Sequence, residues 1–138
     1  MIDLCRSRAP NISVMWSPLG EETMSQYYPG DEYADLVGLS VFGLQAWDRA
    51  KYGQDRDFDD VFGPRYERAA VFDKPVVVAE LGYVGTQDYV DAWDAQVRQE
   101  KDTYPNLVGV LYFNQTEVYP WPEGFGMPDW RVKNQVLK

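Results

Sequence analysis

The sequence predicts an α/β fold in which parallel strands alternate with helices. Four short apolar segments have the composition of buried strands, and loops or helical patterns separate them. One of these segments, Val76-Val77-Val78, is apolar without alternation, as in the strands of a parallel sheet that is covered on both faces. The segments between the strands are long enough for crossover helices, which parallel strands require.

The first half of the chain is predicted to contain two strands and a long irregular loop. Residues 1–9 have the pattern of a helix that is ending, and residues 12–16 form the first strand. Asp31, after a Pro-Gly turn, is placed as the N-cap of a short helix. Residues 36–42 form the second strand. Residues 44–62 are polar and aromatic, and we expect a loop with little regular structure there.

The second half is predicted to contain two more strands and three helices. Pro64 is expected at the first position of a helix, where its missing N–H costs least. Residues 74–82 form the third strand, and apolar residues at helical spacing predict a helix over residues 87–102. The fourth strand covers residues 107–113. Residues 129–132 have the pattern of a final helix that is beginning.

Composition and charge exclude several classes of function. The 138 residues are 45% hydrophobic and 25% charged, which predicts one globular domain over residues 1–138. The net charge of −9 argues against nucleic acid and against anionic membranes as partners, because both demand positive charge. Aromatic residues make up 15% of the chain, and some of them are expected to line a groove.

The chain contains no histidine and one cysteine, so histidine-dependent nucleophilic mechanisms and histidine-ligated metal sites are excluded. No glycine-rich phosphate loop follows any predicted strand, and we expect neither a metal nor a cofactor. We find no membrane-spanning run and no signal peptide. Cysteine usage does not assign a compartment.

Glu80 is the main candidate for chemistry. It stands where the third strand is expected to end, and Gly82 interrupts the chain two residues later. Barrel enzymes carry their catalytic groups at the carboxyl ends of parallel strands. The structural alternative is an acidic residue that only ends a strand, and the local residues favour the two interpretations equally.

The number of strands predicts half of a (β/α)₈ barrel. A complete barrel needs about 250 residues. Four parallel strands cannot close a barrel alone, and they leave two sheet edges unpaired. We therefore expect either a second copy of the chain or a missing half to pair with these edges.

Three motifs occur in a defined order: Trp16-Ser17-Pro18, residues 28–38 and residues 74–82. In this order and spacing they resemble the C-terminal half of the catalytic domain of glycoside hydrolase family 26, which contains β-mannanases and endo-β-glucanases. The resemblance runs from about residue 12 to residue 132. It implies that the four strands are strands five to eight of the barrel, that Glu80 is the catalytic nucleophile, and that the protein is secreted or periplasmic.

The chain departs from this family in two ways. The acid/base glutamate of the family lies on strand four, upstream of the matched segment, and Glu21, Glu22 and Glu117 do not stand in its place. Retaining hydrolysis needs two carboxyl groups about 5 to 5.5 Å apart, so we expect little or no activity of the chain alone. Many relatives also carry a tyrosine that hydrogen-bonds the nucleophile, where this chain has Phe42-Gly43.

A polysaccharide or oligosaccharide is the expected ligand. The substrate-binding residues are predicted to be Trp16, Trp47, Tyr112, Asn114 and Trp121. Two alternatives stay open: a carbohydrate-binding module without catalysis, and a half barrel that self-associates as a homodimer through its open sheet edges. Oligosaccharide binding and sedimentation distinguish them.

Overall fold

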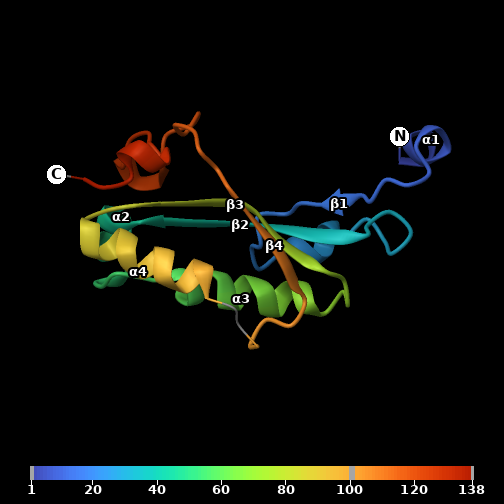
Figure 1. Ribbon diagram of the computed structural model, residues 1–138, viewed down its shortest axis with the longest axis horizontal. Helices are drawn as coiled ribbons and strands as arrows, with labels where there is room; N and C mark the ends of the chain where they lie inside the picture. Colours follow the sequence, from blue (N-terminus) through green and yellow to red (C-terminus); the bar gives the residue numbers. More distant parts are fainter. Residues whose placement is uncertain (1, 100–101, 138) are drawn as a thin grey trace.

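The computed structural model describes residues 2–99 and 102–137, which form an α/β fold with one parallel sheet (Figure 1). The elements, in chain order, are α1 (Ile2–Arg8), β1 (Met15–Trp16), the 3₁₀ helix η1 (Met24–Tyr27), β2 (Leu36–Leu44), α2 (Gln45–Tyr52), α3 (Phe58–Ala70), β3 (Val76–Val84), α4 (Gln87–Arg98), β4 (Leu107–Tyr112), η2 (Pro122–Gly124) and η3 (Val132–Asn134).

The sheet has the strand order β1-β2-β3-β4, and each neighbouring pair is parallel. The predicted fold class is therefore confirmed, and four parallel strands that alternate with helices are the arrangement expected of half a βα barrel. β2 and β3 continue two residues beyond their predicted ends. The C-terminal segment supports this extension, because the N–H of Gly85 donates to the carbonyl of Gln135 at 2.9 Å.

Helices α3 and α4 cover one face of the sheet, here called the helix face (Figure 1). The side chains of Val37, Leu39 and Val41 on β2 point to this face and are fully buried among the helix residues. On the opposite face the C-terminal segment packs against the carboxyl ends of β2 and β3. Its Trp130 is completely buried between Leu44 and Val84 and against a group of aromatic rings.

The predicted loop over residues 44–62 is wrong, because this segment contains α2 and the first turns of α3. Two of the polar residues that indicated a loop, Asp57 and Asp60, form a helix cap instead. The carboxylate of Asp57 accepts a hydrogen bond from the N–H of Asp60, and the Asp60 carboxylate accepts one from the N–H of Asp57. This reciprocal capping box begins α3 before Pro64. Pro64 therefore lies inside the helix and not at its first position.

Other predicted boundaries differ from the structure. No helix begins at Asp31, whose carboxylate accepts a hydrogen bond from the Tyr28 hydroxyl at 2.6 Å, and η1 precedes this turn. The first strand is only two residues long. α4 ends at Arg98, and part of the predicted end of this helix, residues 100–101, lies outside the described residues. The predicted final helix is reduced to η3.

Three buried tyrosines set an alkaline limit to stability. Burial raises the pKa of Tyr104 to about 12 and raises the pKa of Tyr83 and Tyr89 further. Their folded-state pKa values lie above the ordinary value of about 10. The stability they contribute is therefore complete below about pH 10 and is lost as pH rises through the folded-state values.

We expect part of the tyrosinate absorbance to rise only above about pH 11, together with the loss of circular dichroism, because the hydroxyls of Tyr83, Tyr89 and Tyr104 ionise mainly as the fold opens. The measurement is a parallel titration of absorbance and far-ultraviolet dichroism. Ionisation of all ten tyrosines near pH 10 with an unchanged dichroism spectrum would contradict the assignment.

Candidate active-site cleft

A cleft of about 740 Å³ lies at the carboxyl ends of the strands. Its volume is in the range of small-molecule sites. The walls come from β2, β3 and the segments that follow β1, β2 and β4, as expected for a site on a parallel sheet. The lining residues are Leu19, Glu21, Ser40, Phe42, Trp47, Tyr52, Arg56, Arg65, Glu80, Phe113, Glu117, Val118, Tyr119, Trp121 and Pro122.

A β-bulge directs Glu80 into this cleft. Val76 and Val78 are buried on the helix face, and strict alternation would place Glu80 on the same face. The register between β2 and β3 shifts at this point, however: Leu39 pairs with Val78, and the next residue of β2, Ser40, pairs with Glu80. The extra residue re-aims the carboxylate to the opposite face, which is a common role of bulges near functional sites.

Glu80 lies in the middle of β3, four residues before the strand ends, and not at its last position as predicted. Glu80 nevertheless lies near the level at which the pairing of the outer strands ends. β4 pairs with β3 only as far as Leu81, and β1 pairs only with the beginning of β2. The carboxylate is partly buried.

Ser40 supplies the hydrogen bond that Phe42 cannot make. The Ser40 hydroxyl donates to Oε2 of Glu80 at 2.9 Å, whereas the Phe42 ring lines the same cleft without a donor. Such a bond to an ionised acceptor is stronger than a neutral one. Sequence analysis missed Ser40, although it alternates with Gly38 and Phe42 on one face of β2 and this period was a usable signal.

Two of the predicted substrate-binding residues, Trp47 and Trp121, line the cleft together with Glu80. Their ring centres are 6.0 Å apart in an edge-to-face arrangement, and the Trp121 ring rests on the buried Trp130 at 5.2 Å. The indole N–H groups of Trp47 and Trp121 are buried and have no acceptor among the described residues. The cleft wall therefore presents aromatic surface, whereas both indole N–H groups are covered by neighbouring atoms.

The other three predicted binding residues are not among the residues that line the cleft. Trp16 packs edge-on against Tyr28 and Phe72, with ring centres 5.1 and 5.3 Å apart. Tyr112 contacts the ring of Tyr83, and the Asn114 side-chain oxygen accepts the N–H of Val132 at 3.0 Å. The structure does not bring these three side chains to Glu80. A role in binding stays a prediction for them.

Two further carboxylates, Glu21 and Glu117, line the cleft, and both have partners. Glu21 forms an ion pair of 3.2 Å with Arg65. Glu117 accepts one hydrogen bond from the indole N–H of Trp130 at 3.2 Å and another from the N–H of Val118 at 3.0 Å. Across the described ranges, no group of three metal-ligating acidic or sulfur side chains is arranged to hold a metal ion.

The cleft also contains two cationic side chains that sequence analysis did not single out. Arg65 reaches it from α3 and Arg56 from the segment after α2. Arg56 pairs with Asp48, a completely buried carboxylate, at 2.8 Å. Burial raises the pKa of Asp48 above its ordinary range, and the Arg56 charge offsets this effect only in part. These arginines are far from the predicted motifs in sequence, and no local pattern marks them.

Comparison with known proteins gives a distant similarity. No protein-family model matches the chain. The chain is 23% identical over 99 residues to Endoglucanase H of Acetivibrio thermocellus, a glycoside hydrolase. The matched region covers 69% of this chain and 11% of that protein. The chain therefore spans only a small part of the length of the protein that it matches. Within the described residues, none of the helices has the length and apolar character needed to cross a bilayer.

Proposed function

We propose that this chain carries the nucleophile side of a retaining endo-β-glycanase active site, with Glu80 as the nucleophile. The observation that carries the proposal is the bulge in β3, which turns Glu80 out of the helix core and into an aromatic cleft beside Ser40. The four strands then correspond to strands five to eight of a glycoside hydrolase family 26 barrel, with mannan or β-glucan as the substrate class.

In this mechanism the ionised Glu80 carboxylate attacks the anomeric carbon while the bond to the leaving-group oxygen breaks. A proton must reach that oxygen, and water later cleaves the ester that joins Glu80 to the sugar. The Ser40 hydroxyl donates to one Glu80 oxygen and so holds the carboxylate in one orientation in the cleft. Trp47 and Trp121 present aromatic ring surface to the sugar.

Retaining hydrolysis needs a second carboxyl group as general acid and base, and this requirement limits the activity expected of the chain. The family resemblance places the acid/base glutamate on a strand that the four described strands do not include. Glu21 and Glu117 line the cleft but are engaged by Arg65, Trp130 and Val118. Loss of a general acid commonly costs about 10²- to 10⁴-fold in rate. We therefore expect the chain alone to bind oligosaccharides and to hydrolyse them slowly or not at all.

The experiment that tests this function is a titration with manno-oligosaccharides and mixed-linkage gluco-oligosaccharides. Tryptophan fluorescence reports binding, and a reducing-end assay on the same samples reports hydrolysis. We expect a saturable fluorescence change with slow or absent release. Absence of binding to both sugar series would overturn the proposal. Rapid hydrolysis that survives Glu80→Gln would overturn the assignment of the nucleophile.

A second candidate is a carbohydrate-binding function without catalysis. The aromatic ring surface of Trp47 and Trp121 in the cleft favours it, because this surface does not depend on Glu80 chemistry. The two functions separate in the same titration combined with covalent trapping at Glu80. Binding without any reaction at Glu80 supports the second candidate.

Self-association through the sheet edges is a further proposal about partners. In the described part of the sheet, no strand pairs with the outer edge of β1 or of β4. On β4 the side chains of Val108 and Leu111 are 61% and 54% exposed. A second copy could pair its β1 with β4 of the first. Sedimentation equilibrium tests this proposal, and a monomer at high concentration would contradict it.

A further inference from the structure

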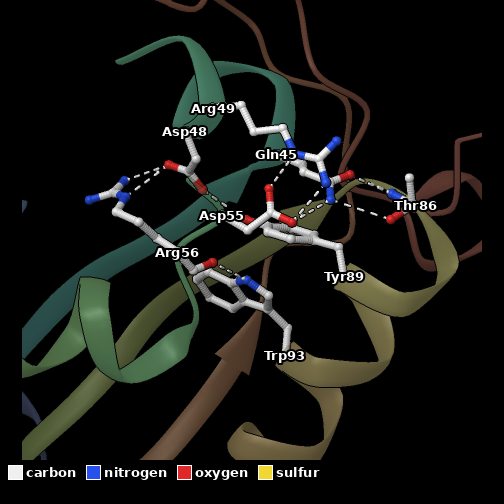
Figure 2. A network of polar contacts seen from close by, with 8 residues as sticks. All are labelled: Gln45, Asp48, Arg49, Asp55, Arg56, Thr86, Tyr89 and Trp93. Carbon is white, nitrogen blue, oxygen red and sulfur yellow. Dashed lines mark hydrogen bonds and ion pairs between the residues drawn. The ribbon is translucent and has the colours of Figure 1, made fainter. Parts of the chain in front are cut away.

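Asp48 is a completely buried carboxylate that stands outside the cleft lining. It lies on α2, one residue after Trp47. Both oxygens are engaged: the hydroxyl of Tyr89 on α4 donates to Oδ2 at 2.9 Å, and Arg56 donates to Oδ1 from two of its nitrogens, at 2.9 and 2.8 Å (Figure 2). The proposed catalytic chemistry assigns no role to this carboxylate.

Arg56 connects this buried carboxylate to the cleft. Its guanidinium carbon lies 4.2 Å from the centre of the Tyr52 ring and 5.4 Å from the centre of the Trp47 ring. Both rings and Arg56 itself line the cleft. The Arg56 backbone is held as well, since its carbonyl accepts the indole N–H of Trp93 at 2.9 Å (Figure 2). The guanidinium therefore has Asp48 on one side and the aromatic cleft wall on the other.

We propose that Asp48 is a positioning residue for the sugar-binding wall of the cleft: it fixes the Arg56 guanidinium against Trp47 and Tyr52 and so fixes the orientation of both rings. This inference rests on the proposed carbohydrate-binding function of the cleft. The contribution of Asp48 to ligand affinity passes through Arg56, because Asp48 does not reach the ligand.

The free-energy cost of burying the Asp48–Arg56 ion pair favours a functional role for it. A buried ion pair pays a desolvation penalty that its attraction often does not repay, and an apolar pair of similar volume would serve stability as well. The charged groups that face Asp48 are Arg56 and, more remotely, Asp55, while Tyr89 faces it with a neutral hydroxyl. What an apolar pair would not provide is a cation stacked on two rings. That contact is directional, and it is strongest where the cation is desolvated.

The neighbouring polar contacts have a different role and supply a matched control. Asp55 forms an ion pair with Arg49 and accepts a hydrogen bond from Gln45, whose side chain also bonds to Thr86 at the start of α4 (Figure 2). This group joins α2 to α4. Asp55, Arg49, Gln45 and Thr86 do not line the cleft. Replacement of Asp55 removes an ion pair of the same network without releasing Arg56.

The experiment uses the full chain labelled with 5-fluorotryptophan, whose five tryptophans give separate fluorine resonances. Trp47→Phe assigns the Trp47 resonance. We expect Asp48→Asn to shift or broaden this resonance and to weaken oligosaccharide affinity about tenfold, the scale of a lost cation–π contact in a partly desolvated site. Asp55→Asn should leave both the resonance and the affinity unchanged. Arg56→Gln should reproduce the Asp48→Asn spectrum, because it removes the cation that Asp48→Asn releases from its fixed position.

An unchanged Trp47 resonance and affinity in folded Asp48→Asn would overturn the inference. If Asp48→Asn does not fold, Arg56→Gln and Arg56→Lys carry the test: loss of affinity in Arg56→Gln with partial retention in Arg56→Lys supports the inference, and equal affinity in all forms overturns it. If the unaltered chain binds no oligosaccharide, the proposed function fails. The fluorine spectra then still decide whether Asp48 orients the Trp47 ring.

Discussion

Glu80→Gln is expected to abolish covalent labelling of the chain by a 2-deoxy-2-fluoro-β-glycoside that carries a dinitrophenolate leaving group. Dinitrophenolate departs without a proton, so the first chemical step no longer needs the acid/base group that the described strands do not supply. The remaining requirement is a carboxylate aligned with the anomeric carbon. The fluorine at carbon two slows the hydrolysis of the ester, so the labelled chain accumulates.

The structure supports this expectation because the bulge presents the Glu80 carboxylate in the cleft and Ser40 donates to one of its oxygens. Glutamine has nearly the same shape but no nucleophilic oxygen anion. Intact-protein mass spectrometry measures the added sugar, and peptide mapping locates it. Both the manno- and the gluco-configured reagents are needed, because the sugar series is itself part of the proposal.

Two variants are matched controls for the labelling. Glu117→Gln, which changes another carboxylate of the same cleft, should be labelled at the normal rate. Ser40→Ala should be labelled more slowly by about 10- to 100-fold, since the Ser40 hydroxyl no longer orients the attacking carboxylate. Labelling of a residue other than Glu80, or normal labelling of Glu80→Gln, would refute the nucleophile assignment.

Trp130→Ala is expected to lower the free energy of unfolding by about 3–5 kcal/mol, the range for deletion of a fully buried aromatic side chain. Trp130 is 0% exposed and fills the opposite face of the sheet between Leu44 and Val84. Its ring is also the surface on which Phe42 and Trp121 rest, with ring centres 4.9 and 5.2 Å away. The cavity left by alanine would therefore loosen the cleft wall as well as the core.

Urea unfolding followed by far-ultraviolet dichroism measures this effect, and Trp130→Phe is the control. Phenylalanine keeps most of the apolar volume but removes the N–H that donates to Glu117 at 3.2 Å. It should cost about 1–3 kcal/mol, from the smaller ring and the lost bond to a carboxylate. A loss below about 1 kcal/mol in Trp130→Ala would show that the C-terminal segment does not contribute to the core as described.

Local patterns in the sequence predicted the class of fold and the main candidate residue. The four strands, their parallel pairing and the helix of residues 87–98 were predicted from the spacing of apolar residues. This spacing is a property of short segments and can be read from each segment separately. Glu80 was chosen because it stands at the expected carboxyl end of a valine-rich strand, where barrel enzymes carry their catalytic groups. Trp47 and Trp121 were chosen as aromatic residues in loops, and the structure places both beside Glu80.

The sequence by itself determined the parallel α/β architecture and the carboxylate that its cleft presents. The tertiary structure alone decided how that cleft is built. The bulge that turns Glu80 depends on the register between β2 and β3, and the Ser40 contact joins residues 40 positions apart. Trp16 and Trp47 were both predicted to bind substrate. Packing places Trp16 against Phe72 and Trp47 in the cleft. Strand register and side-chain packing depend on contacts between residues that are far apart in the sequence. The pattern within one segment therefore does not predict them.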